Sequence, residues 1–353
     1  MRRRLFQQGQ ADSGGVNTMV TIQDVAKLAG VPEKTAARAL AGLTMGKRRD
    51  ARERAERVLK AAAELGYEPS NIARALRQGR TKTLGLITGR LTNLYLAAAA
   101  EVAMDEAARA GYRLLIEISR WESERTYHCV KDFLSYRVDG LLFTSSVPSE
   151  NGHFYKLLAD RHFPLVALLP GTLNFTSVFS DYTETFPEAI RYLAERGNLS
   201  VLFVLPPGRA VLNKVYSRNF EDACKAAGIR GELVDTQNFE DVDVIPERMR
   251  PESVVIFGKY SLKHFVKHAR MIPGYRPDII GFYNEWTWSE HPEEVVGVLF
   301  ANEESLVRTA VRELIAQIEL KVPVHNISFS TEFYPMERFH EIKALNLDLD
   351  YLS

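Results

Sequence analysis

The chain has 353 residues, which exceeds the size of a single compact core and suits two or three domains. Hydrophobic residues make up 46% and charged residues 25%, as in ordinary globular proteins, and no apolar run approaches the ~18 residues that a membrane-spanning helix needs. The net charge is zero, but residues 1–82 carry 17 basic and 8 acidic residues, against 28 and 37 in the remainder. A basic segment on an acidic body is typical of a protein that contacts nucleic acid at one end.

The first eighteen residues are basic but lack the apolar stretch of a secretory signal. We therefore expect a disordered leader (1–18), with Met19 as an alternative start to Met1. Cys129 and Cys224 stand far apart with no histidine at ligand spacing. This pattern predicts buried or idle thiols in a reducing cytoplasm and gives no support for a metal site. No cofactor is expected.

A helix-turn-helix is predicted where the organised sequence begins. Thr21 is placed to cap a first helix, with Asp24 completing a capping box, and Gly30 is placed to end it. Pro32 then opens a second helix that runs to about Ala41. Two short helices around a glycine-containing turn form this motif.

The outward side chains of the second helix favour contact with DNA bases. Glu33, Lys34, Thr35 and Arg38 lie toward its N-terminal half, the part that enters the major groove in this motif. Arginine and lysine donate to guanine, and glutamate accepts from cytosine. An ordinary solvated helix face has the same composition, so these residues alone leave both interpretations open.

A third helix is predicted over residues 50–65, with Val58 and Leu59 among its inward residues. The DNA-binding domain then spans 19–68. A hinge and linker follow over 69–82, and residues 71–78 of this segment are predicted to form a short helix.

Several of these motifs resemble the lactose/galactose repressor (LacI/GalR) family of bacterial transcriptional regulators. The similarity lies in TIQDVAKLAGV, in the helix that ends near Arg38, in ELGYEPSNIARAL and in TKTLGLI. The resemblance implies that Glu33, Lys34 and Arg38 read bases, and that Thr21, Gln23 and Thr35 contact the DNA backbone. It also implies that Ala73 and Leu76 of the hinge enter the minor groove and kink the duplex.

The head departs from the family pattern at its third helix. The loop before Val58 is about four residues longer than in the common pattern, and DARERAER replaces the usual opening of this helix. We therefore expect Lys47, Arg48 and Arg49 to take over part of the phosphate contacts.

The remaining sequence alternates apolar strands with helices, which predicts doubly wound parallel sheets. No GxGxxG, GxxxxGK[ST] or GxSxG motif is present, and the eight histidines are scattered. The residues therefore give no support for a nucleotide site or an enzyme.

The resemblance implies a periplasmic-binding-protein-like effector-binding and dimerisation domain over 83–340, followed by a tail (341–353). Its two doubly wound parallel-sheet subdomains are expected at 83–182 with 301–322, and at 183–300 with 323–340. The chain then crosses three times between them.

The expected effector pocket departs most from the family. Tyr216 stands where the family has an arginine, Lys259-Tyr260 replaces Asn-Asp, and Phe282-Tyr283-Asn284 replaces Tyr-Asp-Asp. Losing these groups weakens ordinary sugar binding. Two alternatives stay open. The effector is an acidic or otherwise atypical sugar derivative, or the pocket responds to another signal or to none. The candidate effector-binding residues are Asn93, Tyr95, Ser145, Tyr216, Arg218, Lys259, Tyr260, Tyr283 and Trp286.

The resemblance therefore implies a cytoplasmic regulator, with repression as the family default. A homodimer would bind a palindromic operator in double-stranded DNA, with its affinity set by a small sugar-like effector in the cleft between the subdomains. The alternative is a solute-binding receptor-type module without DNA regulation, against which the basic head and the missing signal peptide argue. No membrane association is expected. The tail lacks a sustained heptad repeat, so no tetramerising coiled coil is predicted.

Overall fold

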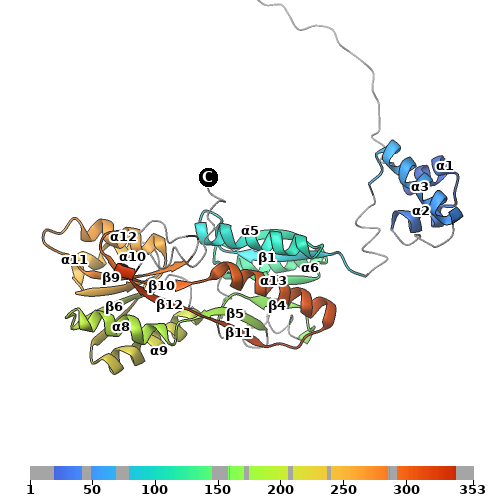
Figure 1. The fold of residues 1–353 in the computed structure, drawn as a ribbon. Coiled ribbons are helices and arrows are strands. Elements are labelled where there is room, and N and C mark those ends of the chain that lie inside the picture. Colours follow the sequence, from blue (N-terminus) through green and yellow to red (C-terminus); the bar gives the residue numbers. More distant parts are fainter. Residues whose placement is uncertain are drawn as a thin grey trace, which may run out of the picture. The chain divides into compact units, whose positions relative to one another are not determined.

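The computed structural model describes residues 20–41, 49–68, 79–144, 158, 160–170, 175–205, 210–236, 240–284, 286 and 292–338. The chain divides between Thr81 and Lys82 into two units, which we call the head and the body (Figure 1). The predicted leader, hinge helix and tail lie outside the described residues. Within the described part of the chain, no helix is long and apolar enough to cross a membrane.

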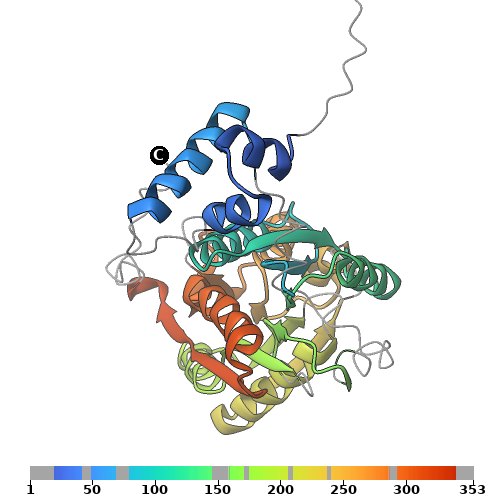
Figure 2. The same cartoon turned by 90° about the vertical axis from the view of Figure 1, so that its right-hand side faces the viewer.

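The described part of the head consists of α1 (Ile22–Ala29), α2 (Glu33–Leu40) and α3 (Arg49–Leu65), which lie against one another (Figure 2). The predicted capping box is confirmed. The backbone N–H of Asp24 donates to the Thr21 hydroxyl, and the Asp24 carboxylate accepts from the Thr21 N–H at 2.9 Å. Gly30 ends α1 in the left-handed conformation, at φ 63°. The predicted helix-turn-helix is therefore present.

Small side chains fill the core of the head, with Val25 and Val58 the largest fully buried ones and alanines supplying the rest. The prediction that Leu59 faces inward was wrong. Leu59 is 52% exposed, and Ala61 is buried instead. The reason is helical spacing. Val58, Ala61, Ala62 and Leu65 recur at three- and four-residue intervals and share one face of α3, whereas Leu59 lies about 100° away from Val58.

The first lobe of the body is a three-layer arrangement around a wholly parallel sheet of six strands, in the order β11-β5-β4-β3-β1-β2. The strands are β1 (Thr83–Thr88), β2 (Arg113–Ile118), β3 (Gly140–Phe143), β4 (Leu165–Ala167), β5 (Thr176–Asp181) and β11 (Asn326–Ser330). Its helices are α5 (Leu94–Arg109), α6 (Ser123–Ser135) and α13 (Glu303–Leu320). Side chains of α5 and α13 share one core cluster, and those of α6 pack into another with the alternate strand residues.

The second lobe repeats this architecture with one antiparallel edge strand. The order is β12-β10-β9-β8-β6-β7, and only β12 runs against its neighbour. Its strands are β6 (Ser200–Leu205), β7 (Arg230–Asp235), β8 (Ser253–Ile256), β9 (Asp278–Asn284), β10 (Val295–Ala301) and β12 (Glu332–Pro335). Its helices are α8 (Thr185–Glu195), α9 (Ala210–Ala227), α10 (Glu240–Asp243), α11 (Ile245–Arg248) and α12 (Lys259–Ala269), with a final turn η2 (Met336–Arg338).

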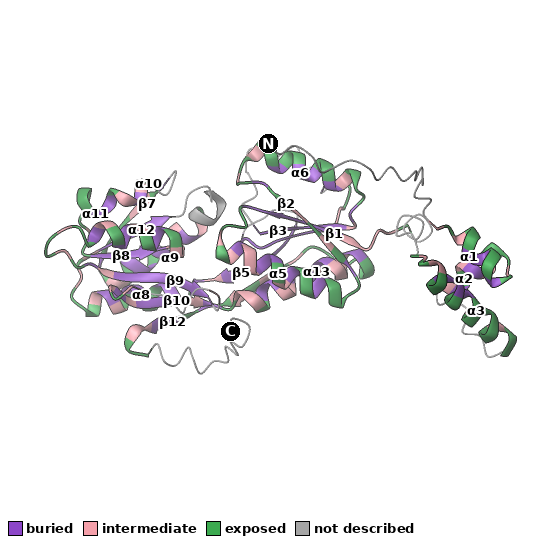
Figure 3. Cartoon of the chain, turned by 90° about the horizontal axis from the view of Figure 1, so that it is seen from above, coloured by how far each residue is buried: buried purple, intermediate pink, exposed green. Residues whose placement is uncertain are grey.

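Burial follows these layers. The central strands are buried along nearly their whole length, while the helices are exposed on their outer faces (Figure 3). Strands covered by helices on both faces have continuous apolar sequences, which is why β3, β4 and β8 were readable in the sequence. The predicted doubly wound parallel architecture is confirmed.

The chain passes between the lobes after β5, after β10 and after β11. The predicted division placed 323–340 entirely in the second subdomain, and this was wrong for β11. Asn326–Ser330 pairs in parallel with β5 of the first lobe, so the third crossing falls at Thr331. The place of β11 is decided by strand pairing. Without β11, β5 would be the unpaired edge strand of the first sheet, and β11 pairs with it from Asn326, which lies opposite Ser177.

A buried carboxylate joins α5 to α13. Glu106 is only 6% exposed, and its two oxygens accept from Arg109 at 3.0 Å, Arg308 at 3.1 Å and Arg312 at 2.7 Å. Burial alone raises the pKa of this carboxyl, but the three guanidinium groups outweigh it, so the pKa is below its ordinary value of 4.5. The ionised form of Glu106 therefore stabilises the fold.

We expect Glu106→Gln to lower the free energy of unfolding by about 1–3 kcal/mol at neutral pH. A carboxyl with a lowered pKa contributes stability above its ordinary pKa, and this contribution is lost as the pH falls through the folded-state pKa. In urea unfolding series taken from pH 7 to about pH 3, the difference between wild type and variant should therefore stay constant down to the ordinary pKa of 4.5 and shrink below it. Glu124→Gln, at a side chain that is 92% exposed, is the matched control. A loss that does not change with pH would contradict the role of the ionised carboxylate.

Candidate functional sites

The predicted base-reading residues lie together on the exposed surface of the head. Glu33, Lys34 and Arg38 are exposed on α2, at its first, second and sixth residues. The inward side of the same helix is closed by Ala36 and Ala39, which are buried against α1 and α3. Because these alanines fix which side of α2 faces the core, the three polar residues are directed away from it. This arrangement presents one acceptor and two cationic donors to a partner.

The predicted backbone-contacting residues have more varied surroundings. The Thr21 hydroxyl is already engaged in the capping box, where its hydrogen bond to Asp24 holds the pKa of that carboxyl below its usual value. Gln23 is exposed, Thr35 is partly buried, and exposed Arg49 pairs with Glu53 on its own helix at 3.0 Å. Lys47, Arg48, Ala73 and Leu76 lie outside the described residues, and their roles stay predictions.

In the body, ligands of doubly wound sheets gather where the strand order reverses. In the first lobe this point lies between β1 and β3, at their carboxyl ends. There the hydroxyls of Thr88 and Thr144 form a buried hydrogen bond of 2.8 Å, and the Ser119 hydroxyl donates to the Thr88 carbonyl. The indole of Trp121 lies against Gly89, so closely that a Cβ there would be 2.4 Å from the ring. The protein's own side chains therefore occupy this end of the sheet.

A polar cluster forms where the two lobes meet. The Glu303 carboxylate, at the start of α13, accepts from the Tyr95 hydroxyl at 3.0 Å and from the Ser180 hydroxyl at 2.8 Å. The Tyr95 ring lies 5.7 Å from the ring of Trp286, measured between centroids. Trp286 follows β9 of the second lobe, yet it packs against the core cluster of the first lobe. We call Tyr95, Ser180, Trp286 and Glu303 the junction cluster.

Two of the predicted effector tyrosines belong to the protein core instead. Tyr216 is 4% exposed and contacts the rings of Tyr182, Phe257 and Phe282. Tyr283 is 3% exposed on the opposite face of the same sheet, where its hydroxyl has no hydrogen-bond partner among the described residues and burial raises its pKa. The structure favours a packing role for both, because a ligand does not reach side chains enclosed by their own lobe.

The other predicted effector residues are spread over three elements. Asn93 caps α5, where its side-chain oxygen accepts from the Leu96 N–H. Lys259 is partly buried at the first turn of α12, and Tyr260 is 56% exposed with its ring against His264. Arg218 is exposed on α9, and Ser145 lies outside the described residues. Of the predicted effector set, the structure therefore brings together Tyr95 and Trp286, with Asn93 in the preceding cap.

Sequence reasoning missed Glu303 and Ser180. Each is a polar residue at the end of a buried strand, which is a sequence signal for a binding site: Glu303 follows β10, and Ser180 is the last residue but one of β5. A serine and a glutamate are common surface residues, so no pattern in the sequence indicates that these two are in contact. Their proximity arises only because α13 begins at the crossing between the lobes.

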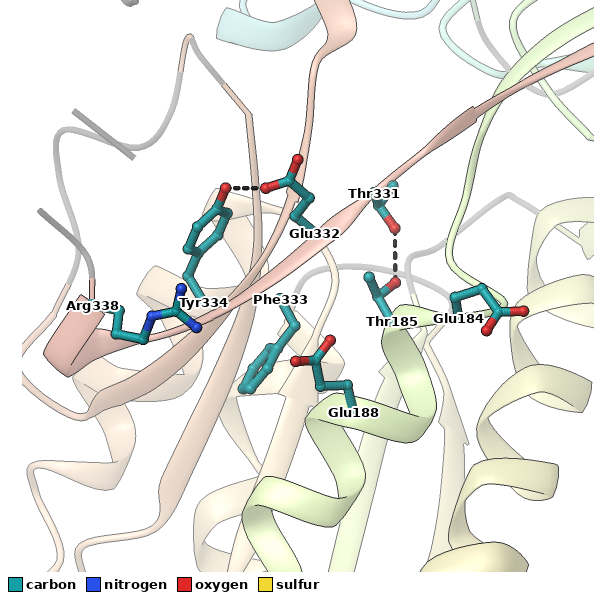
Figure 4. A pocket seen from close by; sticks show the side chains of 8 residues that line it. All are labelled: Glu184, Thr185, Glu188, Thr331, Glu332, Phe333, Tyr334 and Arg338. Carbon is teal, nitrogen blue, oxygen red and sulfur yellow. Dashed lines mark hydrogen bonds between the residues drawn. The ribbon is translucent and has the colours of Figure 1, made fainter. Parts of the chain in front are cut away.

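A separate cavity of about 440 Å³ lies near the crossings (Figure 4). The hydroxyls of Thr185 and Thr331 meet at 2.7 Å on its wall, and the Tyr334 hydroxyl donates to Glu332. The remaining lining residues are Glu184, Glu188, Phe333 and Arg338. Among the described residues of the predicted effector set, none lines this cavity.

Residues 21–70 match the family model described as bacterial regulatory proteins, lacI family. The chain is 30% identical to the catabolite repressor/activator of Escherichia coli K12 over 200 residues, which cover 53% of this chain and 59% of that protein. The match thus spans less than two thirds of that relative's length.

Two solved structures have the same fold. The lac repressor dimer bound to operator and the anti-inducer ONPF superposes with a TM-score of 0.74 at 16% identity, covering 89% of this chain and 97% of that chain. The Cra transcriptional dual regulator of Pseudomonas putida, in complex with fructose 1-phosphate, gives a TM-score of 0.63 at 20% identity, covering 72% and 98%. Together with the match of the head, these findings confirm the resemblance predicted from the sequence.

Proposed function

Because this chain carries a lacI-family head on a body with the fold of the lac repressor, we propose that it is a sequence-specific DNA-binding transcriptional regulator. The observation that carries the proposal is the capped helix-turn-helix that exposes Glu33, Lys34 and Arg38. A homodimer would place two such helices in successive major grooves of a palindromic operator. We propose that it acts as a repressor. We place it in the cytoplasm, where it has access to the operator DNA.

The body supplies the regulation in this proposal. Two lobes joined by three chain crossings form a unit that a ligand between them can close, and closure changes the affinity of the head for DNA. We propose a small sugar-like effector or an acidic sugar derivative. The P. putida structure with fructose 1-phosphate supports this class, and so do the aromatic rings of Tyr95 and Trp286 at the lobe junction. We assign no catalytic activity, because the relatives are named as regulators.

The DNA-binding part is tested by incubating the purified full-length protein with fragmented genomic DNA and sequencing the fragments that it retains. We expect a short near-palindrome to be enriched and to lose its enrichment with Arg38→Ala. Retention without any common sequence at moderate salt would contradict sequence-specific regulation and would favour a solute-binding module.

The effector part is tested by thermal denaturation with a panel of sugars, sugar acids and sugar phosphates that includes fructose 1-phosphate. A ligand that binds only the folded state raises the melting temperature in a concentration-dependent way. We expect at least one member to do so. A panel without any response would overturn the effector assignment and leave the DNA-binding part intact.

A further inference from the structure

Helix α13 extends from the junction of the lobes to the first residue of the body. Its 18 residues correspond to about 27 Å of helix. Glu303, at one end, lies in the junction cluster, and Glu319, in the last turn, contacts Lys82. Lys82 directly follows the division between head and body, so it is where the linker enters the body.

Lys82 is held by contacts of its side chain and of its backbone. Its ammonium group lies 2.5 Å from a Glu319 oxygen and 4.2 Å from the centre of the Tyr112 ring, and the Tyr112 hydroxyl donates to the same oxygen at 3.2 Å. Its backbone N–H donates to Asp139 at 2.8 Å, and its carbonyl accepts from the Arg113 N–H at 2.9 Å. We call Lys82, Tyr112 and Glu319 the linker clamp.

The backbone conformation of Lys82 also indicates that its surroundings hold it in place. Its φ of 51° lies in the left-handed region, which disfavours residues other than glycine, so the surrounding contacts hold it there. The hydrogen bond to Glu319 also raises the pKa of Lys82, which keeps the ammonium group charged at physiological pH. The linker therefore leaves the body from a position that the clamp defines.

Between its two ends α13 is held along its length. Leu306, Ala310, Leu314 and Ile318 are buried in the first-lobe core, and Gly140 allows such close packing that a Cβ there would lie 2.8 Å from Leu314. The side-chain amide of Gln317 donates to Thr176 at 2.7 Å. This packing makes α13 a continuous rigid element between Glu303 and Glu319, the kind of element through which two sites can be coupled.

We propose that α13 couples the lobe junction to the linker, with Lys82 as a positioning residue for the DNA-binding head. In this proposal, a shift of Trp286 against Tyr95 displaces Glu303 at the start of α13. The displacement of α13 then moves Glu319, and with it the linker clamp. The inference deepens the proposed function, since the position of the linker matters for regulation only if the head binds DNA.

The coupling itself is tested by amide hydrogen exchange in the full-length protein, without DNA or effector. Glu303→Ala breaks the junction cluster, and we expect it to speed exchange at the amides of Lys82 and Arg113 about fivefold or more. Glu304→Ala is the matched control. It removes the same charge from the same helix turn, but the Glu304 carboxylate pairs with Arg308, which is not a member of the junction cluster. We expect it to change the exchange less than about twofold.

Tyr95→Phe removes a single hydroxyl and keeps the test valid if Glu303→Ala does not fold. We expect it to speed exchange at the same two amides. Unchanged exchange at Lys82 in both variants, or an equal increase with Glu304→Ala, would overturn the coupling through α13.

The regulatory consequence is tested on the operator recovered above. We expect Lys82→Met to weaken operator binding about fivefold or more, and Lys82→Arg, which keeps the cation, to stay within about twofold of wild type. Glu303→Ala should change the operator affinity in the wild-type background but not in Lys82→Met. An unchanged affinity in Lys82→Met would overturn the positioning role. If no operator exists, the proposed function fails, and hydrogen exchange still decides the coupling.

Discussion

Arg38→Ala is expected to lower operator affinity by about 10- to 100-fold, the largest effect on DNA binding that we predict for a single residue. The guanidinium is exposed on α2, on the side away from the buried Ala36 and Ala39. A guanidinium that donates twice to guanine discriminates between bases, so its loss removes specificity as well as affinity. The measurement is fluorescence anisotropy of the full-length protein with the operator and with a scrambled duplex of the same length.

Arg57→Ala is the matched control, because Arg57 is an exposed arginine of the head on α3 rather than α2. Both variants lose one positive charge, so both weaken non-specific binding to a similar, salt-dependent extent. Only Arg38→Ala is expected to reduce the ratio of operator to scrambled affinity. Equal losses on both duplexes for the two variants would show that Arg38 acts through charge alone and does not read bases.

Tyr216→Ala is expected to lower the free energy of unfolding of the body by about 3–5 kcal/mol. Tyr216 is enclosed by Tyr182, Phe257 and Phe282, and truncating a buried aromatic ring both loses apolar burial and leaves a cavity. The same truncation at Tyr260, which is 56% exposed, should cost less than about 1 kcal/mol. Urea unfolding followed by tyrosine and tryptophan fluorescence measures both.

This pair of variants decides between packing and ligand contact for the position where the family has an arginine. If Tyr216 were an effector contact at an open pocket, its truncation would affect stability as little as that of Tyr260. A small loss for Tyr216→Ala would therefore contradict the packing role that the structure gives it. A large loss would confirm the packing role.

Local chemistry made the head readable from the sequence. Thr21, Asp24 and Gly30 satisfy the free backbone groups at the ends of α1 through neighbours within a few residues, so their pattern identifies the helix by itself. The same holds for the buried strands, since β3 and β8 are buried at every residue and only Ser253 among these residues is polar. Polar edge strands escaped this signal. β7 is RGELVD and mostly exposed, and it exists as a strand because it pairs with β6.

The candidate DNA-binding residues could be predicted from local sequence patterns, whereas the candidate effector residues could not. The exposed face of α2 follows from helical periodicity once the alanines are placed inward, so the base-reading residues were predictable from residues 33–40 alone. The effector residues were not, because strand alternation places Phe282 and Tyr283 on opposite faces of β9 without saying what covers each face. The helices of the second lobe cover both, and this encloses Tyr216 and Tyr283.

Three features could be predicted from the sequence alone: the capped helix-turn-helix, the alternation of strands and helices, and the family to which the head is similar. Each depends on residues close together in the chain, whose spacing fixes their conformation. Three other features became evident only in the folded chain: β11 joins the first sheet, Glu303 contacts Tyr95 and Ser180, and Glu319 contacts Lys82. Glu319 and Lys82 are separated by 237 positions, and no local pattern encodes a contact between common charged residues at that distance. Such contacts arise when the packing of α13 on its sheet brings the two ends of the lobe together.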